Sequence, residues 1–79
     1  ETNNIKIYPN PVNDVLHIET ELGIEEVSVF DVFGRSIVAE SQSHKVTKTS
    51  VDLSNLKSGI YFVKINTNEG NIVKRIIKQ

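Results

Sequence analysis

The residues best suited to acid–base or nucleophilic chemistry in this chain of 79 residues are two histidines and several serines. Such chemistry needs a nucleophile, a base and an orienting group that converge in one pocket. His17 falls in a stretch with the alternation of a β-strand, whereas His44 falls in the most polar segment, residues 41–45. No triad can be assembled from them, so we expect no enzymatic activity and interpret both histidines as ordinary strand or loop residues.

Acidic residues are the next candidates, as ligands of a metal ion. They are Asp14, Glu19, Glu21, Glu25 and Glu26. None follows the dense D-x-[DN]-x-[DN]-G pattern of a calcium loop, and two isolated histidines without cysteine do not predict a structural zinc site. We therefore interpret the acids as solvated loop charge and expect no cofactor and no metal, with structural calcium as the alternative.

The bulk composition excludes several classes of protein. The formal net charge is −1 and the charges are interleaved, so no basic field exists to attract nucleic acid. The longest apolar runs are too short to span a membrane, and residues 1–4 do not resemble a signal peptide. With no cysteine, one small domain must be held by packing alone. We expect it to be a fragment of a larger polypeptide.

Seven short segments have the composition or the alternation of strands, and turn residues separate them. They are residues 5–8, 14–20, 25–32, 35–40, 46–53, 60–65 and 72–79. This pattern predicts an all-β fold, a seven-stranded antiparallel immunoglobulin-like β-sandwich, although the cysteine and tryptophan core of immunoglobulin domains is absent. A small open barrel is the alternative.

The connections between these segments are also partly predictable. The Pro-Asn-Pro sequence at 9–11 forms a stiff corner, because each proline fixes φ and lacks an N–H donor. Residues 31–34 predict a turn with glycine at positive φ. Residues 41–45 predict a solvated loop, and residues 54–59 predict a helical turn or tight corner.

The last two segments predict a β-hairpin around a Gly/Asn turn. Alternation along the first places Tyr61 and the two aliphatic residues that follow it on the inner face. A two-residue turn at 69–70 would place Ile76 opposite Val63, and a three-residue loop would place Ile77 there. In either register a cation lies among apolar residues, which is typical of an edge strand.

Four stretches, in this order and spacing, resemble one known family. They are residues 7–11 (IYPNP), 29–35 (VFDVFGR), 51–65 (VDLSNLKSGIYFVKI) and 74–79 (KRIIKQ). Together they resemble the type A C-terminal sorting domain of type IX secretion cargo, also called the Por secretion tail. The resemblance covers essentially the whole chain, but Phe30 stands where tyrosine is frequent and residues 38–50 have no distinctive match.

The resemblance implies that residues 1–79 are a single C-terminal sorting domain, with residues 1–4 as a remnant of the linker to the cargo. The attached cargo would cross the periplasm of a Gram-negative bacterium and reach the cell surface or the medium. Implied partners are the outer-membrane shuttle and translocon components of the secretion apparatus, and a surface sortase that removes the tail. We expect no nucleic acid or small-molecule substrate, and a monomer or a weak dimer through an edge strand.

The resemblance also assigns recognition or signal roles to individual residues. They are Pro9, Asn10 and Pro11 in the opening motif, Asp31, Gly34 and Arg35 in the central turn, Gly59 and Tyr61 in the late strand, and Lys74, Arg75 and Lys78 in the basic end. From spacing alone, the three cations are interpreted as ordinary solubilising residues of an edge strand, and Tyr61 as a core residue. The alternative function is an immunoglobulin-like adhesive or carbohydrate-binding module, which two tyrosines and three phenylalanines equip poorly. A fragment of a hydrolase is the least favoured of the possible functions.

Overall fold

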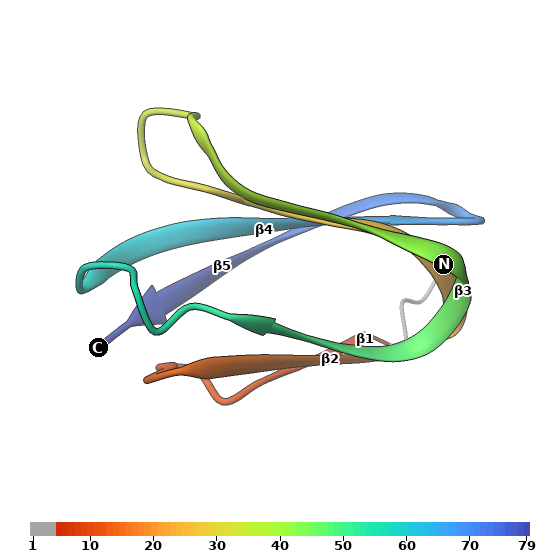
Figure 1. Cartoon of the computed structure of the whole chain (residues 1–79), viewed down its shortest axis with the longest axis horizontal. Coiled ribbons are helices and arrows are strands. Elements are labelled where there is room, and N and C mark those ends of the chain that lie inside the picture. Colours follow the sequence, from red (N-terminus) through yellow and green to blue (C-terminus); the bar gives the residue numbers. More distant parts are fainter. Residues whose placement is uncertain (1–4) are drawn as a thin grey trace.

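The computed structural model describes residues 5–79, apart from the side chains of residues 41–45, and in this part of the chain it contains five strands. They are β1 (Ile5–Tyr8), β2 (Val15–Phe30), β3 (Ser36–Asp52), β4 (Gly59–Thr67) and β5 (Gly70–Lys78). All strand pairs are antiparallel and belong to one curled sheet (Figure 1). The predicted all-β antiparallel class is therefore confirmed. The predicted linker remnant, residues 1–4, and the side chain of His44 lie outside the described residues.

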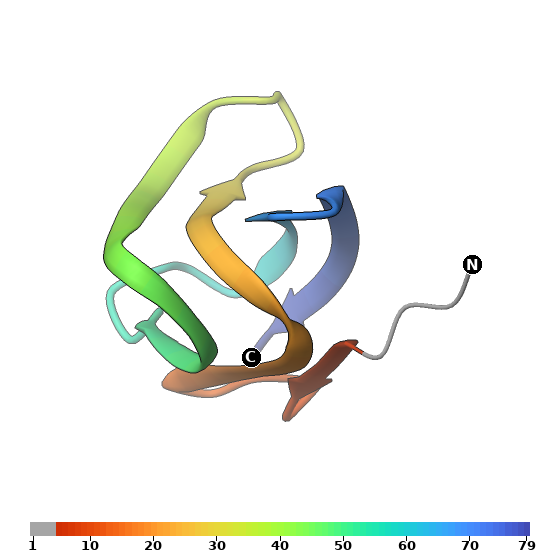
Figure 2. The ribbon, with the colours of Figure 1, turned by 90° about the vertical axis from the view of Figure 1, so that its right-hand side faces the viewer.

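Strand β2 is the centre of the sheet. It pairs with β1 and then β4 along one side and with β3 along the other, and β5 pairs with β4. The long β2–β3 ribbon bends at its middle, so the sheet folds over into two layers (Figure 1). The strand order β1-β2-β4-β5 ends at β1 and β5, and β3 lies off this path on the other side of β2 (Figure 2).

The predicted count of seven strands becomes five because two pairs of segments are continuous. Strand β2 covers 14–20 and 25–32 almost entirely, and β3 covers 35–40, the expected loop 41–45 and most of 46–53. The β2–β3 register shifts on both sides of Ile24, and the buried positions of β2 change there from even to odd numbers. A bulge bends a strand and reverses which residues face inward, so the sequence pattern breaks where the chain continues.

The layered arrangement also bears on the predicted topology. The described strands form a single curled sheet, and its strand order gives no evidence for the two separate sheets of an immunoglobulin-like sandwich. That finer prediction is not confirmed, and the curled sheet is closer to the open-barrel alternative. No helix long and apolar enough to cross a membrane occurs among the described residues.

The loop of the β4–β5 hairpin consists of Asn68 and Glu69, between the paired residues Thr67 and Gly70. The Thr67 Oγ1 accepts the N–H of Glu69 (3.0 Å) and donates to the carbonyl of Gly70 (2.9 Å). The loop is also tied to β2, because the N–H of Asn68 donates to the Gly23 carbonyl (3.1 Å) and the N–H of Gly23 donates to Asn68 Oδ1 (2.8 Å). These bonds start the loop one residue earlier than either predicted register.

The resulting hairpin register places Lys74 opposite Val63, so both predicted registers are wrong. The observed register has an electrostatic advantage. Arg75 lies opposite Phe62, whereas a turn at 69–70 would have placed it opposite Lys64, and like charges directly across a ladder are unfavourable.

A core of aliphatic side chains and one tyrosine fills the space between the layers. Its members are Val12, Leu16, Ile18, Ile24, Val27, Val29, Val51, Leu53, Tyr61, Val63, Ile65 and Ile76. The predicted inner face of β4 is confirmed, since Tyr61 and alternate residues after it are buried while Ile60 is exposed. All five strands therefore contribute to one core, with partly buried Ile5 and Ile7 representing β1.

Candidate functional site

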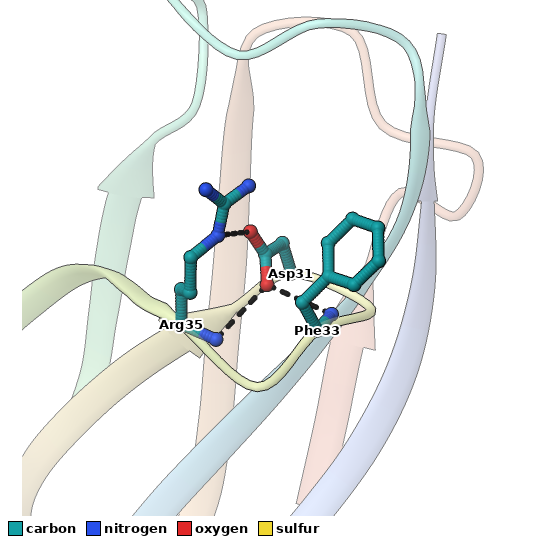
Figure 3. A network of polar contacts seen from close by, with 3 residues as sticks. All are labelled: Asp31, Phe33 and Arg35. Atoms are coloured by element: carbon teal, nitrogen blue, oxygen red, sulfur yellow. Dashed lines mark hydrogen bonds and ion pairs between the residues drawn. The ribbon is translucent and has the colours of Figure 1, made fainter.

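The turn between β2 and β3 is organised by the carboxylate of Asp31 (Figure 3). Its Oδ1 accepts the N–H groups of Phe33 and Arg35 (both 2.9 Å), and its Oδ2 accepts Nε–H of Arg35 (2.6 Å). The N–H of Gly34 donates to the Asp31 carbonyl (3.0 Å), and Gly34 has the predicted positive φ of +83°. Asp31, Gly34 and Arg35 thus form one local hydrogen-bonded unit.

The same turn combines a buried anion with an exposed apolar tip. Burial alone would raise the pKa of Asp31, but the N–H donors and the charge of Arg35 outweigh it and hold this pKa below its usual value. The Arg35 guanidinium lies 5.4 Å from the centre of the Phe33 ring, and Phe33 is 79% exposed. The sequence analysis missed Phe33, although an aromatic residue inside a short turn has no strand to carry it into a core.

The Pro-Asn-Pro corner contacts the end of β5. Asn10 Oδ1 accepts the N–H of Ile77 (3.0 Å). The N–H of Val12 donates to the Ile77 carbonyl (2.8 Å), and the N–H of Gln79 donates to the Val12 carbonyl (2.9 Å). Because Val12 is fully buried, this corner is anchored by packing as well as by hydrogen bonds. Val12 was also missed, since one valine between turn residues has no periodic signal.

The corner between β3 and β4 is held in a similar way. The N–H of Ser54 donates to Asp52 Oδ1 (2.9 Å), so Asp52 caps the start of the corner predicted at residues 54–59. Hydrogen bonds from Ser54 also lower the pKa of this carboxyl. The Tyr61 hydroxyl donates to the Lys57 carbonyl (2.8 Å), and Gly59 has a φ of +156°, which side-chain-bearing residues rarely adopt. Tyr61 is a core residue whose polar end ties this corner to β4.

The three cations of the basic end lie in different environments. Lys74 and Arg75 are exposed, whereas Lys78 is only 6% exposed and shares the buried face of Ile76. The Lys78 ammonium donates to the Gln79 carbonyl (2.9 Å). The expected set of three exposed cations on β5 is therefore corrected to two. The alternation of β5 carries Lys78 inward, and its long aliphatic stem tolerates that burial.

The structure gathers most of the candidate residues at one end of the molecule. Three turns and the end of β5 lie at this end (Figure 1): residues 9–14, 31–35, 52–59 and 77–79. We call this region the clasped end, because side chains bond to the backbone in each of its parts. Gly59 lies opposite Lys78, and Asn10 bonds to Ile77, so two of the turns meet at β5. Lys74 and Arg75 lie further back along the strand.

A groove separates the two extremities of the sheet, β1 and β5. Its volume is about 200 Å³. The lining residues are Ile5, Ile7, Asn10, Lys74, Arg75 and Ile76. We call it the β1–β5 groove. It brings the opening motif and the basic end together, which the sequence could not indicate because the two are more than sixty residues apart.

The outer face of β1 and β2 carries the other titratable cluster. The Tyr8 ring stacks on His17 with the ring centres 5.3 Å apart, and the Tyr8 hydroxyl donates to Glu19. This hydrogen bond raises the pKa of Tyr8 and lowers that of Glu19, so the tyrosine is a poor base or nucleophile. His17 is an exposed strand residue. Among the described side chains no three histidines or acids are grouped to hold a metal ion, and the absence of metal stays a prediction.

Comparison with known protein families identifies the chain. Residues 6–79 match the family model described as the secretion system C-terminal sorting domain. The match covers almost every residue, including all four stretches that carry the resemblance. No curated protein matches the chain.

Proposed function

This chain belongs to the family of secretion-system C-terminal sorting domains, and from this premise we propose that it is the address label of a cargo protein, carried with that cargo through the outer membrane. The family is a sorting signal of type IX secretion, and proteins that carry it are exported to the surface or secreted. The observation that carries the proposal is the match over residues 6–79.

We propose that the tail acts as a folded recognition module. In support of this, the motif residues of the clasped end are used mainly to hold turns and the end of β5 in place. A rigid surface loses less conformational entropy on binding than a flexible one, so such bracing favours recognition. The two exposed cations, Lys74 and Arg75, lie on the strand that these turns support.

The route that we propose has three steps. The cargo enters the periplasm by a separate N-terminal signal, an outer-membrane shuttle and translocon receive the folded tail, and a surface sortase removes it ahead of β1. The tail itself contributes binding and no catalysis.

The test is a fusion of residues 1–79 behind a signal peptide and a fluorescent reporter, in a bacterium with a type IX system. We expect the reporter to appear outside the cell. The matched strain lacks the translocon and should keep the same fusion in the periplasm. Mass spectrometry of the exported reporter should show that the tail has been removed. Periplasmic retention in both strains would contradict the sorting role.

A further inference from the structure

The boundary between β1 and β5 is closed at one end and open along the rest. At the clasped end, Val12 pairs with Lys78 in a parallel bridge, and the N–H and carbonyl of Ile77 are bonded to Asn10 and Val12. Beyond this bridge, and within the part of the chain that the structure describes, β1 pairs only with β2, and β5 pairs only with β4. The open part is the β1–β5 groove.

The open part presents backbone groups of β5 that pair with no other strand in residues 5–79. In an antiparallel ladder the N–H and C=O of successive residues point to opposite sides. Since those of Ile77 point away from β4, those of Arg75 and Val73 point to the same open side. This side of β5 is therefore a template for one more strand.

The side chains around this edge define what such a strand must carry. Three apolar residues and one amide line the groove together with Lys74 and Arg75, and among the described residues no acid lines it. No ion pair of either cation is present among the described residues. An incoming strand would place an apolar face on the side that Lys74 shares with Ile76, and would need negative charge on the opposite side, beside Arg75.

We propose that the β1–β5 groove receives an extended, acidic segment of a partner protein, which adds to β5 as a further strand. Apolar side chains on one face of that segment enter the groove beside Ile76, and carboxylates on its other face pair with Arg75. This inference rests on the proposed function, because the partner would be the component of the secretion apparatus that receives the tail.

Other occupants fit less well. The groove volume of about 200 Å³ is below the roughly 300 Å³ at which small-molecule sites begin, and it matches a few side chains. A second copy pairing β5 with β5 would bring Lys74 and Arg75 of both copies together, and like charges across a ladder are destabilising. An acidic segment avoids that repulsion.

The probe that tests the inference is a capped decapeptide of alternating valine and glutamate, with a lysine-for-glutamate peptide as its control. Binding to the 79-residue chain is followed by backbone amide shifts and by hydrogen exchange. We expect the glutamate peptide to bind at millimolar concentration or below, to shift β1 and β5, and to slow exchange at Val73 and Arg75. The lysine peptide should not bind.

Three variants sharpen the test. Val73→Pro removes an N–H that faces the open edge, so it should leave the β4 ladder intact and abolish binding. Arg75→Glu should weaken binding about tenfold and confer binding of the lysine peptide. The control Lys57→Glu makes the same change of charge at an exposed residue outside the groove. It should bind the glutamate peptide as tightly as the wild-type chain does.

Several results would overturn the inference. They are the absence of binding, equal binding of both peptides, shifts confined to the far face, self-association of β5, and normal binding by folded Val73→Pro and Arg75→Glu. If the Val73→Pro variant unfolds, the binding of the two peptides to the Arg75→Glu variant decides the test by itself. Because wild-type export is measured separately, failure of peptide binding is distinguishable from failure of the sorting role.

Discussion

The clasped end and the β1–β5 groove meet along β5 and are built in opposite ways. At the clasped end, Asn10 and Val12 use the outward backbone groups of Ile77, and Asp31 fixes its own turn. Along the groove, the equivalent groups of β5 face outward beside two cations that have no ion pair with any described residue. The motif residues of the clasped end thus hold turns and the end of β5, whereas the groove is where we propose that a partner binds.

The largest contrast is expected between two neighbouring isoleucines of β5. Ile76 is 1% exposed and belongs to the core, so Ile76→Ala should lower the free energy of unfolding by about 2–5 kcal/mol. Ile77 is 43% exposed, so Ile77→Ala should cost only about 0.5 kcal/mol. Urea unfolding followed by circular dichroism measures both. Equal losses would contradict the inward and outward assignment along β5.

A smaller effect is expected where the clasped end meets β5. Asn10→Ala leaves the N–H of Ile77 without its acceptor and should cost about 1 kcal/mol. Asn10→Asp is the matched control, because a carboxylate oxygen still accepts the bond. Hydrogen exchange at Ile77 should accelerate in the alanine variant alone. Unchanged exchange would show that the corner does not hold the strand.

The Asp31 turn should give a modest effect that depends on pH. The pKa of Asp31 is lowered in the folded chain, so ionised Asp31 stabilises the fold above the pKa of the unfolded state, and that stability is lost as pH falls through the folded value. Asp31→Asn keeps an acceptor for the two backbone donors but loses the charge beside Arg35. Its melting temperature should lie a few degrees below wild type at neutral pH and approach it in acid. A constant difference across pH would contradict the assignment.

The smallest effect on stability is expected in the groove. Lys74 and Arg75 are exposed and have no described ion pair, so the double variant Lys74→Glu/Arg75→Glu should change the free energy of unfolding by no more than about 0.5 kcal/mol. Thermal unfolding is sufficient to measure it. A large loss would mean that these cations stabilise the fold and are not held in reserve for a partner.

The parts of the fold that sequence predicted are those governed by local rules. Alternation revealed the inner face that begins at Tyr61, and the Asp31–Gly34 turn followed from its residue types. The continuity of β2 and β3 was hidden because bulges beside Ile24 break the period that reveals a strand. A bulge has no reliable amino-acid signature. The sequence pattern therefore predicts seven separate segments where the structure has five strands.

The candidate site was less predictable because it depends on contacts between distant residues. Nothing local to Asn10 indicates that its side chain bonds to Ile77. The burial of Lys78 follows from the hairpin register, which in turn depends on bonds between Asn68 and Gly23. The family resemblance assigned recognition roles to residues of both regions, and those roles stay a prediction; their arrangement shows which of them hold turns and which line the groove.

The account is tested most directly by comparing export of three reporter fusions: the wild-type tail, the Lys74→Glu/Arg75→Glu tail and the Lys57→Glu tail. All three should be equally folded. We predict that the wild-type and Lys57→Glu tails carry the reporter out of the cell, while the doubly reversed tail leaves it in the periplasm. Export of all three at the same level would contradict the claim that the exposed cations of β5 are what the secretion apparatus recognises.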